Sequence, residues 1–203
     1  MRSAAGIRRV GKEYLPQELA ALLNRQAAIL KTGEGGVTFS GGEPLMQADF
    51  IAEVIDLLDD LHILLDTSGY GGERDFRLLL DRVNLVYYDL KLIEPQAHRQ
   101  YTGRYNDLIL QNLQTLSTSG VPFVIRVPLV PGITDTNENL VAIARTIKDI
   151  PGMLRVDLLP YNRAAGAKYR AAGREFKPDY DETSPVNANV AIFEKAGIKV
   201  RVV

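Results

Sequence analysis

The chain has 203 residues, enough for one domain with a full hydrophobic core, and its 24 Lys and Arg residues nearly balance 25 Asp and Glu residues. The net charge of −1 leaves no excess of positive charge to drive sequence-independent binding of nucleic acid. The sequence contains no cysteine, which excludes disulfides, thiolate nucleophiles and any zinc or iron–sulfur centre held by thiolates of this chain.

The N-terminal residues and the lengths of the apolar runs indicate the compartment. The stretch MRSAAGIRRVGKEYLPQEL lacks the apolar core of a signal peptide, and no apolar run approaches the roughly 20 residues that cross a bilayer. We therefore expect a soluble, cytoplasmic protein that folds as one domain over residues 1–203. The two histidines, His62 and His98, are too far apart in the sequence to suggest a local metal pair.

Apolar segments rich in β-formers alternate with segments of helical periodicity along almost the whole chain. This alternation is typical of βα units, which build a parallel sheet, so we predict an α/β fold. Helices are predicted at 15–30, 47–61, 73–83, 105–120, 136–150 and 187–197. Strands are predicted at 35–40, 62–66, 84–89, 122–130, 155–161 and 199–203.

Two predicted loops are longer than a βα connection requires. They cover residues 92–106 and 162–185, and both are polar and contain Gly and Pro. Long loops in compact domains are more often functional than short ones, so both are candidates for a binding role.

Polar residues follow the predicted strands at their C-terminal ends. In barrels and open sheets of parallel strands, these ends carry the ligand site, so we expect the polar groups to face one another. Each group alone also fits a helix cap or a tight turn, which are commoner uses of Ser, Asp and Gly. The groups are Ser40-Gly41-Gly42-Glu43, Asp66-Thr67-Ser68-Gly69, Asp89-Leu90-Lys91, Arg126 and Asn162.

Asp89 and Lys91 are the most informative of these residues. They lie two positions apart on a strand and therefore point to the same face, which Tyr87 shares. On an interior face the two charges need each other or a ligand, so either a structural ion pair or a binding site is expected. Arg126 likewise needs a carboxylate. Together these groups suit a zwitterion, with Glu43 for its ammonium group and Lys91 or Arg126 for its oxygens.

Six motifs, in this order and spacing, resemble the glycyl-radical-enzyme activating enzymes, a family of radical S-adenosylmethionine enzymes. They are GGVTFSGGEPLMQ, LLDTSGY, VYYDLK, HRQYTG, IRVPLVPGITD and LLPYN followed by KY, and the match extends from about Gly11 to Val203. The resemblance implies a partial (β/α)6 TIM-like barrel of parallel strands, here lacking the first βα unit. It also implies S-adenosylmethionine as a cofactor, together with a [4Fe–4S] cluster in full-length members.

The resemblance further implies which residues bind S-adenosylmethionine. The loop at 41–43 would hold the methionine amino group. Asp66 and Asp89, with Thr67 and Tyr87, would surround the methionyl carboxylate and a monovalent cation. Asn162 stands where the family has a histidine near the ribose; an amide still forms hydrogen bonds but cannot carry a positive charge. The implied set is Gly41, Gly42, Glu43, Asp66, Thr67, Ser68, Tyr87, Asp89, Lys91, Arg126 and Asn162.

The missing cysteines are the main departure from the family. Members hold their cluster on a CxxxCxxC loop, and the carboxylates of this chain are hard donors that are poor replacements for thiolates. We therefore expect the chain alone to be inactive in reductive cleavage of S-adenosylmethionine. The sequence fits a fragment of a longer enzyme, which we favour, a split reading frame, or a natural relative without a cluster.

The resemblance also implies the partners. A glycyl radical enzyme would present its glycine loop, which we expect near Lys168, Tyr169 and Arg170, and full-length relatives would take electrons from a flavodoxin-type or ferredoxin-type protein. Two alternatives remain open. The chain could be a non-catalytic module that binds S-adenosylmethionine or docks the partner, or an unrelated barrel enzyme in which Lys91 forms a Schiff base.

The expected loss of the first βα unit has a structural consequence. The strand at 35–40 would lie at an open sheet edge, and no charged residue in GGVTFS discourages pairing with another strand. We therefore expect edge-to-edge association or marginal solubility.

Overall fold

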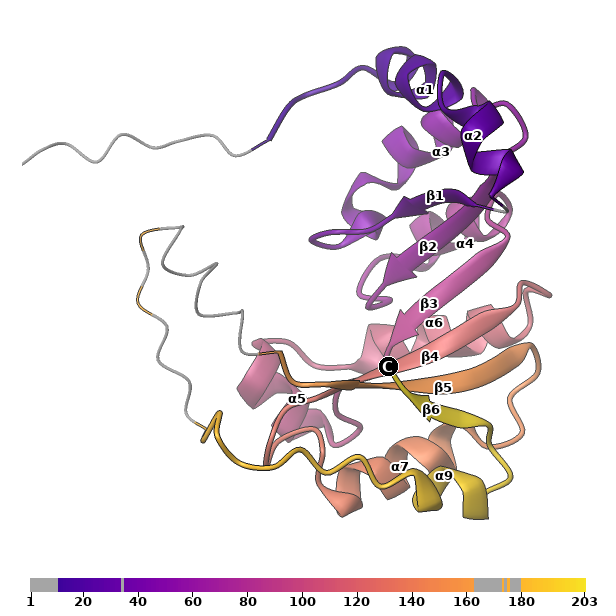
Figure 1. The fold of residues 1–203 in the computed structure, drawn as a ribbon. Helices are drawn as coiled ribbons and strands as arrows, with labels where there is room; N and C mark the ends of the chain where they lie inside the picture. Colours follow the sequence, from indigo (N-terminus) through magenta and orange to yellow (C-terminus); the bar gives the residue numbers. More distant parts are fainter. Residues whose placement is uncertain (1–10, 34, 163–172, 174, 176–179) are drawn as a thin grey trace, which may run out of the picture.

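The computed structural model describes residues 11–33, 35–162, 173, 175 and 180–203. Six parallel strands form one sheet in the order β1-β2-β3-β4-β5-β6, so each strand lies beside its neighbour in the sequence. The sheet curves, with β1 and β6 at its two free edges (Figure 1). The predicted α/β partial barrel is therefore confirmed. The strands are β1 (Gly36–Phe39), β2 (His62–Thr67), β3 (Leu85–Asp89), β4 (Phe123–Leu129), β5 (Met153–Pro160) and β6 (Val200–Val202).

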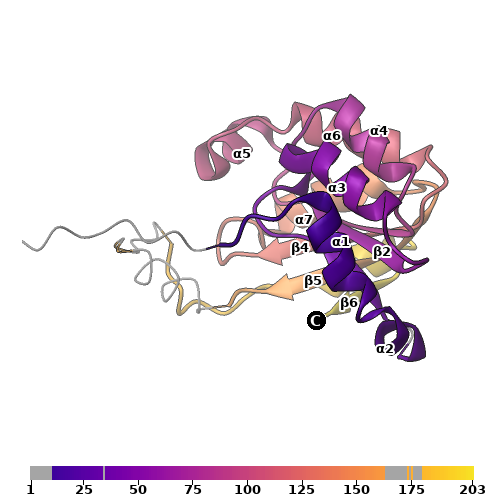
Figure 2. The same ribbon diagram turned by 90° about the horizontal axis from the view of Figure 1, so that it is seen from above.

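The helices cover the outside of the curved sheet, where α4 contacts both α3 and α6 and α7 contacts α9 (Figures 1 and 2). Apolar residues that follow helical spacing meet the apolar strand positions there, and this contact forms the core. The helices are α1 (Pro16–Asn24), α2 (Ala27–Thr32), the 3-10 helix η1 (Pro44–Gln47), α3 (Ala48–Asp56), α4 (Glu73–Leu80), α5 (Pro95–Thr102), α6 (Asp107–Ser117), α7 (Asn137–Ile147) and α9 (Val190–Lys195).

Two predicted segments differ from the structure. The helix predicted at 15–30 is two helices, α1 and α2, and the side chain of Asn24 at the end of α1 forms hydrogen bonds with the backbone of Leu57 and Asp59. The loop predicted at 92–106 contains α5. Glu94 caps this helix by accepting hydrogen bonds from two backbone amides, a signal that the sequence carries as Glu followed by Pro.

The inner face of the sheet carries a row of alternating charges. Asp89 on β3 is in register with Arg126 on β4, Arg126 with Asp157 on β5, and Asp157 with Arg201 on β6. Residues in register on neighbouring strands point to the same face, so each charge in the row lies beside charges of the opposite sign. The strand register thereby pairs charges that would be costly to leave alone in the interior.

Asp157 is the most buried member of this row, at 3% exposed. Arg155 donates to its two carboxylate oxygens at 2.8 and 3.2 Å, and Arg201 donates to the same oxygens at 2.7 and 3.0 Å. Burial alone would raise the pKa of this carboxyl, but the hydrogen bonds and charges of the two guanidinium groups outweigh burial and lower it. Asp157 therefore stays ionised and joins β5 to the edge strand β6.

No helix in the described part of the chain is long and apolar enough to cross a membrane.

Strand β1 should drive self-association, because it pairs with β2 on one side only and Thr38 is exposed on it. In size-exclusion chromatography, the apparent mass should rise with protein concentration. Thr38→Lys places a charge on the edge and should keep the chain monomeric, whereas Gln114→Lys on the exposed face of α6 should not. A wild-type monomer at every concentration would contradict this prediction.

Replacing Asp157 by Asn should lower the free energy of unfolding at neutral pH by about 2–3 kcal/mol, because two guanidinium groups lose their anion and one of them is half exposed. The pKa of Asp157 is lower in the folded state than in the unfolded state, where it is near 3.9, so the ionised carboxylate stabilises the fold at pH values above about 3.9. This stabilisation is lost as the pH falls below that value and through the folded-state pKa. Urea unfolding of both proteins should therefore show a constant difference above about pH 4 that shrinks in acid. A difference that does not depend on pH would contradict the assignment.

Candidate functional site

The loop after β1 begins the site. Gly41 and Gly42 have φ angles of 85° and 60°, in the left-handed region that favours glycine. A Cβ atom at either position would meet no atom within 4 Å, so the loop backbone faces open space at this point. The two glycines turn the chain into η1 and place Glu43 at the N-terminal cap of that helix.

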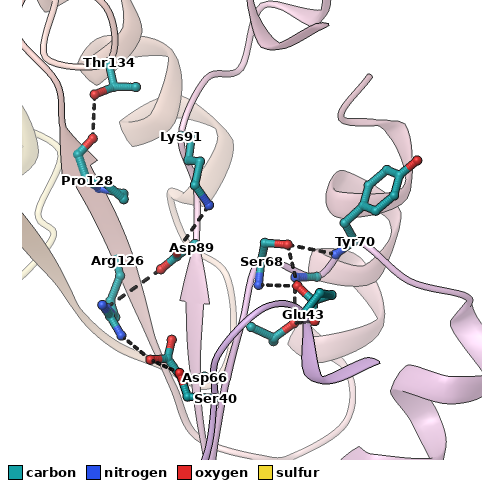
Figure 3. Close-up of polar contacts among 12 residues, drawn as sticks. Ser40, Glu43, Asp66, Ser68, Tyr70, Asp89, Lys91, Arg126, Pro128 and Thr134 are labelled. Carbon is teal, nitrogen blue, oxygen red and sulfur yellow. Dashed lines mark hydrogen bonds and ion pairs between the residues drawn. The ribbon is translucent and has the colours of Figure 1, made fainter. Parts of the chain in front are cut away.

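The Glu43 carboxylate ties the loop after β1 to the end of β2 (Figure 3). Its Oε1 accepts hydrogen bonds from the amide of Leu45 at 3.2 Å and the hydroxyl of Thr67 at 2.5 Å. Its Oε2 accepts from the amide and hydroxyl of Ser68 at 3.0 and 2.6 Å. These donors use the roughly four acceptor positions of a carboxylate. An ammonium group would therefore reach Glu43 by replacing one of them.

The other polar strand ends form a chain of charges across β2, β3 and β4 (Figure 3). Asp66 Oδ2 accepts from the hydroxyl of Ser40 at 3.1 Å and from Nη1 of Arg126 at 2.7 Å. The Nε of Arg126 lies 3.8 Å from Asp89 Oδ1, and Lys91 Nζ donates to Asp89 Oδ2 at 3.2 Å. The structure thus confirms that Asp89 and Lys91 share a face and that Arg126 meets carboxylates.

One acceptor in this chain of charges has no hydrogen bond. Asp89 Oδ1 is buried and lacks a hydrogen-bond donor within the described residues, with only the 3.8 Å ion pair to Arg126 nearby. Buried polar atoms are almost always hydrogen-bonded, so this oxygen is an acceptor that is available to a further donor. The guanidinium of Arg126 lies between Asp66 and Asp89, where the sequence predicts a monovalent cation. The cation stays a prediction, and among the described residues no group of three or more His, Cys, Asp and Glu could hold a metal ion.

The two tyrosines of β3 have different roles. Tyr87 is half-buried on the inner face, with the guanidinium of Arg126 5.5 Å from the centre of its ring. Tyr88 is fully buried on the outer face and donates to the carbonyl of Ile109 at 2.6 Å. Burial, and then the charge of Glu43, raises the pKa of Tyr88 well above its usual value. A Cβ atom at Gly69 would collide with the Tyr88 hydroxyl, so only glycine fits there.

Asn139 on α7 holds the backbone around Lys91. Its side-chain amide donates to the carbonyls of Lys91 and Thr134, both at 2.8 Å, and its oxygen accepts from the amide of Ile93 at 3.1 Å. Sequence analysis missed this residue because it lies in the first turn of a helix, well after the strand ends that it supports. The sequence feature that could have identified Asn139 is its place at the third position of a helix that Thr136 caps.

Not all of the predicted site is described. Asn162 is exposed, two residues after the end of β5. Lys168, Tyr169 and Arg170, the predicted contacts for a partner, lie outside the described residues. Their role therefore stays a prediction.

A cavity of about 210 Å³ adjoins the site. Three of the predicted residues line it: Glu43, Ser68 and Lys91. Sequence analysis did not assign the opposite wall, which includes Tyr70, His98 and Arg104. His98 is 4% exposed, and its Nδ1 lies 2.7 Å from the carbonyl of Arg104, which can only accept; Nδ1 therefore carries a proton.

Comparisons with known proteins identify the family of this chain. The family model for the radical SAM superfamily matches residues 3–145. The 4-hydroxyphenylacetate decarboxylase activating enzyme of Clostridioides difficile (strain 630) is 32% identical over 179 residues, covering 84% of this chain and 56% of the relative. The trans-4-hydroxy-L-proline dehydratase activating enzyme of Clostridioides difficile is 35% identical over 165 residues, covering 79% and 54%.

Other relatives include proteins that activate pyruvate formate-lyase. The pyruvate formate-lyase-activating enzyme of Clostridium pasteurianum is 33% identical over 169 residues, which cover 82% of this chain and 71% of that enzyme. A solved domain of the enzyme from Bacteroides vulgatus ATCC 8482 superposes with a TM-score of 0.66 at 22% identity, covering 83% of this chain and 99% of the domain.

The chain spans 56% and 54% of the lengths of the first two relatives. Across that span, the superfamily match, the identities and the shared partial barrel agree with one another. The chain therefore belongs to the radical SAM superfamily, and within it to the glycyl-radical-enzyme activating enzymes.

Proposed function

We propose that this chain is the S-adenosylmethionine-binding body of an enzyme that activates a glycyl radical enzyme. The observation that carries this proposal is the convergence of Glu43 with the Asp66–Arg126–Asp89–Lys91 chain of charges at the carboxyl ends of the strands. The curated relatives are named as activating enzymes of a decarboxylase, a dehydratase and a lyase, which supports the same activity for the protein to which this chain belongs.

The site suits the methionyl end of S-adenosylmethionine because that end is a zwitterion. We place its carboxylate against Lys91 and Arg126, which remain partly exposed at the strand ends although each is already paired with a neighbouring carboxylate. Its ammonium group would donate to Glu43 in place of the Ser68 hydroxyl. Asp89 Oδ1, which accepts no hydrogen bond from the described residues, offers a second acceptor close by.

Bound S-adenosylmethionine would supply a sulfonium whose carbon–sulfur bond is the one broken in this family. The residues of this chain bind and orient it. The ion pairs and the Glu43 hydrogen bonds already hold these side chains at the strand ends, and binding would exchange the Ser68 hydroxyl for the ligand's ammonium group.

An iron–sulfur cluster does not fit the donor set of this chain. The sequence contains no cysteine, and the carboxylates at the strand ends are hard donors that do not suit iron–sulfur chemistry. We therefore derive no redox step for these residues and expect the 203-residue chain alone to be inactive. This donor set also favours a second candidate function, a module that binds S-adenosylmethionine or docks the partner without its own chemistry.

Titration calorimetry with S-adenosylmethionine should show binding by the wild-type chain. Lys91→Ala and Glu43→Ala should each weaken it by about tenfold or more, because each removes a charge that faces the zwitterion. Lys195→Ala on the distant helix α9 is the matched control and should bind as the wild type does.

The thermal midpoint of each variant should be measured in parallel, because Glu43 also ties the loop after β1 to β2. Lys91 has no such structural role beyond its pair with Asp89. Unchanged affinity in both variants would refute this placement of the pocket, and no binding by the wild type would refute the proposed function.

A further inference from the structure

Three side chains join the end of β5 to a segment about 20 residues later in the chain. The hydroxyl of Tyr161, the first residue after β5, donates to Oε1 of Glu182 at 2.5 Å. The hydroxyl of Tyr180 donates to that of Tyr161 at 3.0 Å, and the two rings meet edge to face with their centres 5.5 Å apart. We refer to Tyr161, Tyr180 and Glu182 as the tyrosine cluster.

The hydroxyl of Tyr161 is the centre of this cluster. All three side chains are half-buried. Burial, and then the hydrogen bond to Glu182, raises the pKa of Tyr161 above its usual value, so the hydroxyl keeps its proton and remains a donor. The bonds on both sides of this hydroxyl hold the Tyr161 side chain in one position, and with it the backbone that leads to Asn162.

The segment that carries Glu182 is shaped by a local turn. The carboxylate of Asp181 accepts from the amide and the hydroxyl of Thr183 at 2.8 and 2.6 Å, and from the hydroxyl of Ser184 at 3.0 Å. Bonds of this kind, from an Asp side chain to residues shortly after it, stabilise turns. Glu182 lies within the turn, so its backbone is held in place on both sides.

Asp135, in the loop after β4, anchors the same segment farther along the chain. It is 3% exposed, and its Oδ1 accepts from the amide of Gly132 at 2.7 Å, while its Oδ2 accepts from the amide of Asn187 at 2.8 Å. The side-chain amide of Asn187 donates back to the carbonyl of Asp135 at 2.8 Å. The loop after β4 therefore holds the segment that supplies Tyr180 and Glu182, and the tyrosine cluster in turn holds the end of β5.

Asn162 follows Tyr161 at the carboxyl end of β5, which lies beside the end of β4. Asp157 is in register with Arg126, and Asn162 lies five residues beyond Asp157, or roughly 16 Å along an extended chain. A ligand whose carboxylate meets Lys91 and Arg126 can therefore reach Asn162 only with its opposite end. In S-adenosylmethionine that end is the nucleoside, whose polar atoms an amide can both donate to and accept from.

We propose that the tyrosine cluster holds Asn162 in the position that the nucleoside end of S-adenosylmethionine requires. Tyr161 and Glu182 are then positioning residues, because they act through their neighbour Asn162. The inference rests on the proposed function, since it takes the methionyl end of the same ligand to lie at Lys91 and Arg126. It adds to that function a set of side chains that lies apart from the charges at the strand ends.

The test compares two ligands by titration calorimetry. 5′-Methylthioadenosine keeps the nucleoside of S-adenosylmethionine and lacks its amino-acid group. Tyr161→Phe removes only the hydroxyl and should weaken the binding of both ligands by about threefold to tenfold. Lys91→Ala should weaken the binding of S-adenosylmethionine alone. Tyr105→Phe, which removes a hydroxyl that is bonded to Arg99 at 2.7 Å, is the matched control and should bind both ligands as the wild type does.

Three further variants separate positioning from a general loss of structure. Glu182→Gln keeps an oxygen that accepts from Tyr161, so it should bind 5′-methylthioadenosine as the wild type does, whereas Glu182→Leu should bind it as weakly as Tyr161→Phe. Asn162→Ala should itself weaken the binding of this ligand. Adding Tyr161→Phe to Asn162→Ala should cause no further loss, because the tyrosine cluster acts through Asn162.

Any of four results would overturn the inference. They are an unchanged affinity of Tyr161→Phe for 5′-methylthioadenosine, equal losses in Glu182→Gln and Glu182→Leu, a full effect of Tyr161→Phe in the Asn162→Ala background, and a wild type that binds S-adenosylmethionine but not 5′-methylthioadenosine. In each case, binding of S-adenosylmethionine by the wild type leaves the proposed function intact. A wild type that binds neither ligand would refute the proposed function and this inference together.

Discussion

The site depends on the position of the Arg126 guanidinium between two carboxylates. It donates to Asp66 on β2 and faces Asp89 on β3, which in turn holds Lys91. Charges inside a barrel are costly unless they are paired. Here the parallel register places Asp89 beside Arg126, and Arg126 also reaches across β3 to Asp66 on β2. The same register extends the alternation to Asp157 and Arg201 near the free edge of the sheet.

The second constraint is the set of hydrogen bonds that joins the loop after β1 to the end of β2. Glu43 is bonded to Thr67 and Ser68 through both oxygens, so the loop after β1 cannot move independently of the loop after β2. The loop after β2 also packs closely, since Gly69 leaves no space between its backbone and the Tyr88 hydroxyl. A ligand that entered here would meet side chains that are already held in place, with Asp89 Oδ1 as an acceptor that has no hydrogen bond from the described residues.

Much of the fold follows from the sequence pattern, while the local exceptions come from side chains that act at a distance. The alternation of strand and helix signals predicts all six strands and the parallel sheet, because period and composition are local properties. At the division of the first helix, the side chain of Asn24 forms hydrogen bonds with Leu57 and Asp59, which a local sequence pattern does not reveal. Helix α5 was readable from Glu94 and Pro95, yet its polar composition favoured a loop. The turn that carries Arg104 was therefore not assigned to the site.

The sequence by itself determined the fold class, the family motifs, the absence of thiolate ligands and the shared face of Asp89 and Lys91, since each follows from composition or from spacing along one strand. Only the tertiary structure decided that Arg126 lies between Asp66 and Asp89, that Glu43 is held by Thr67 and Ser68, and that Arg104 lines a cavity beside the site. These contacts join residues that are distant in the sequence. The register of neighbouring strands and the packing of α5 set their distances, and neither quantity can be read from a local pattern.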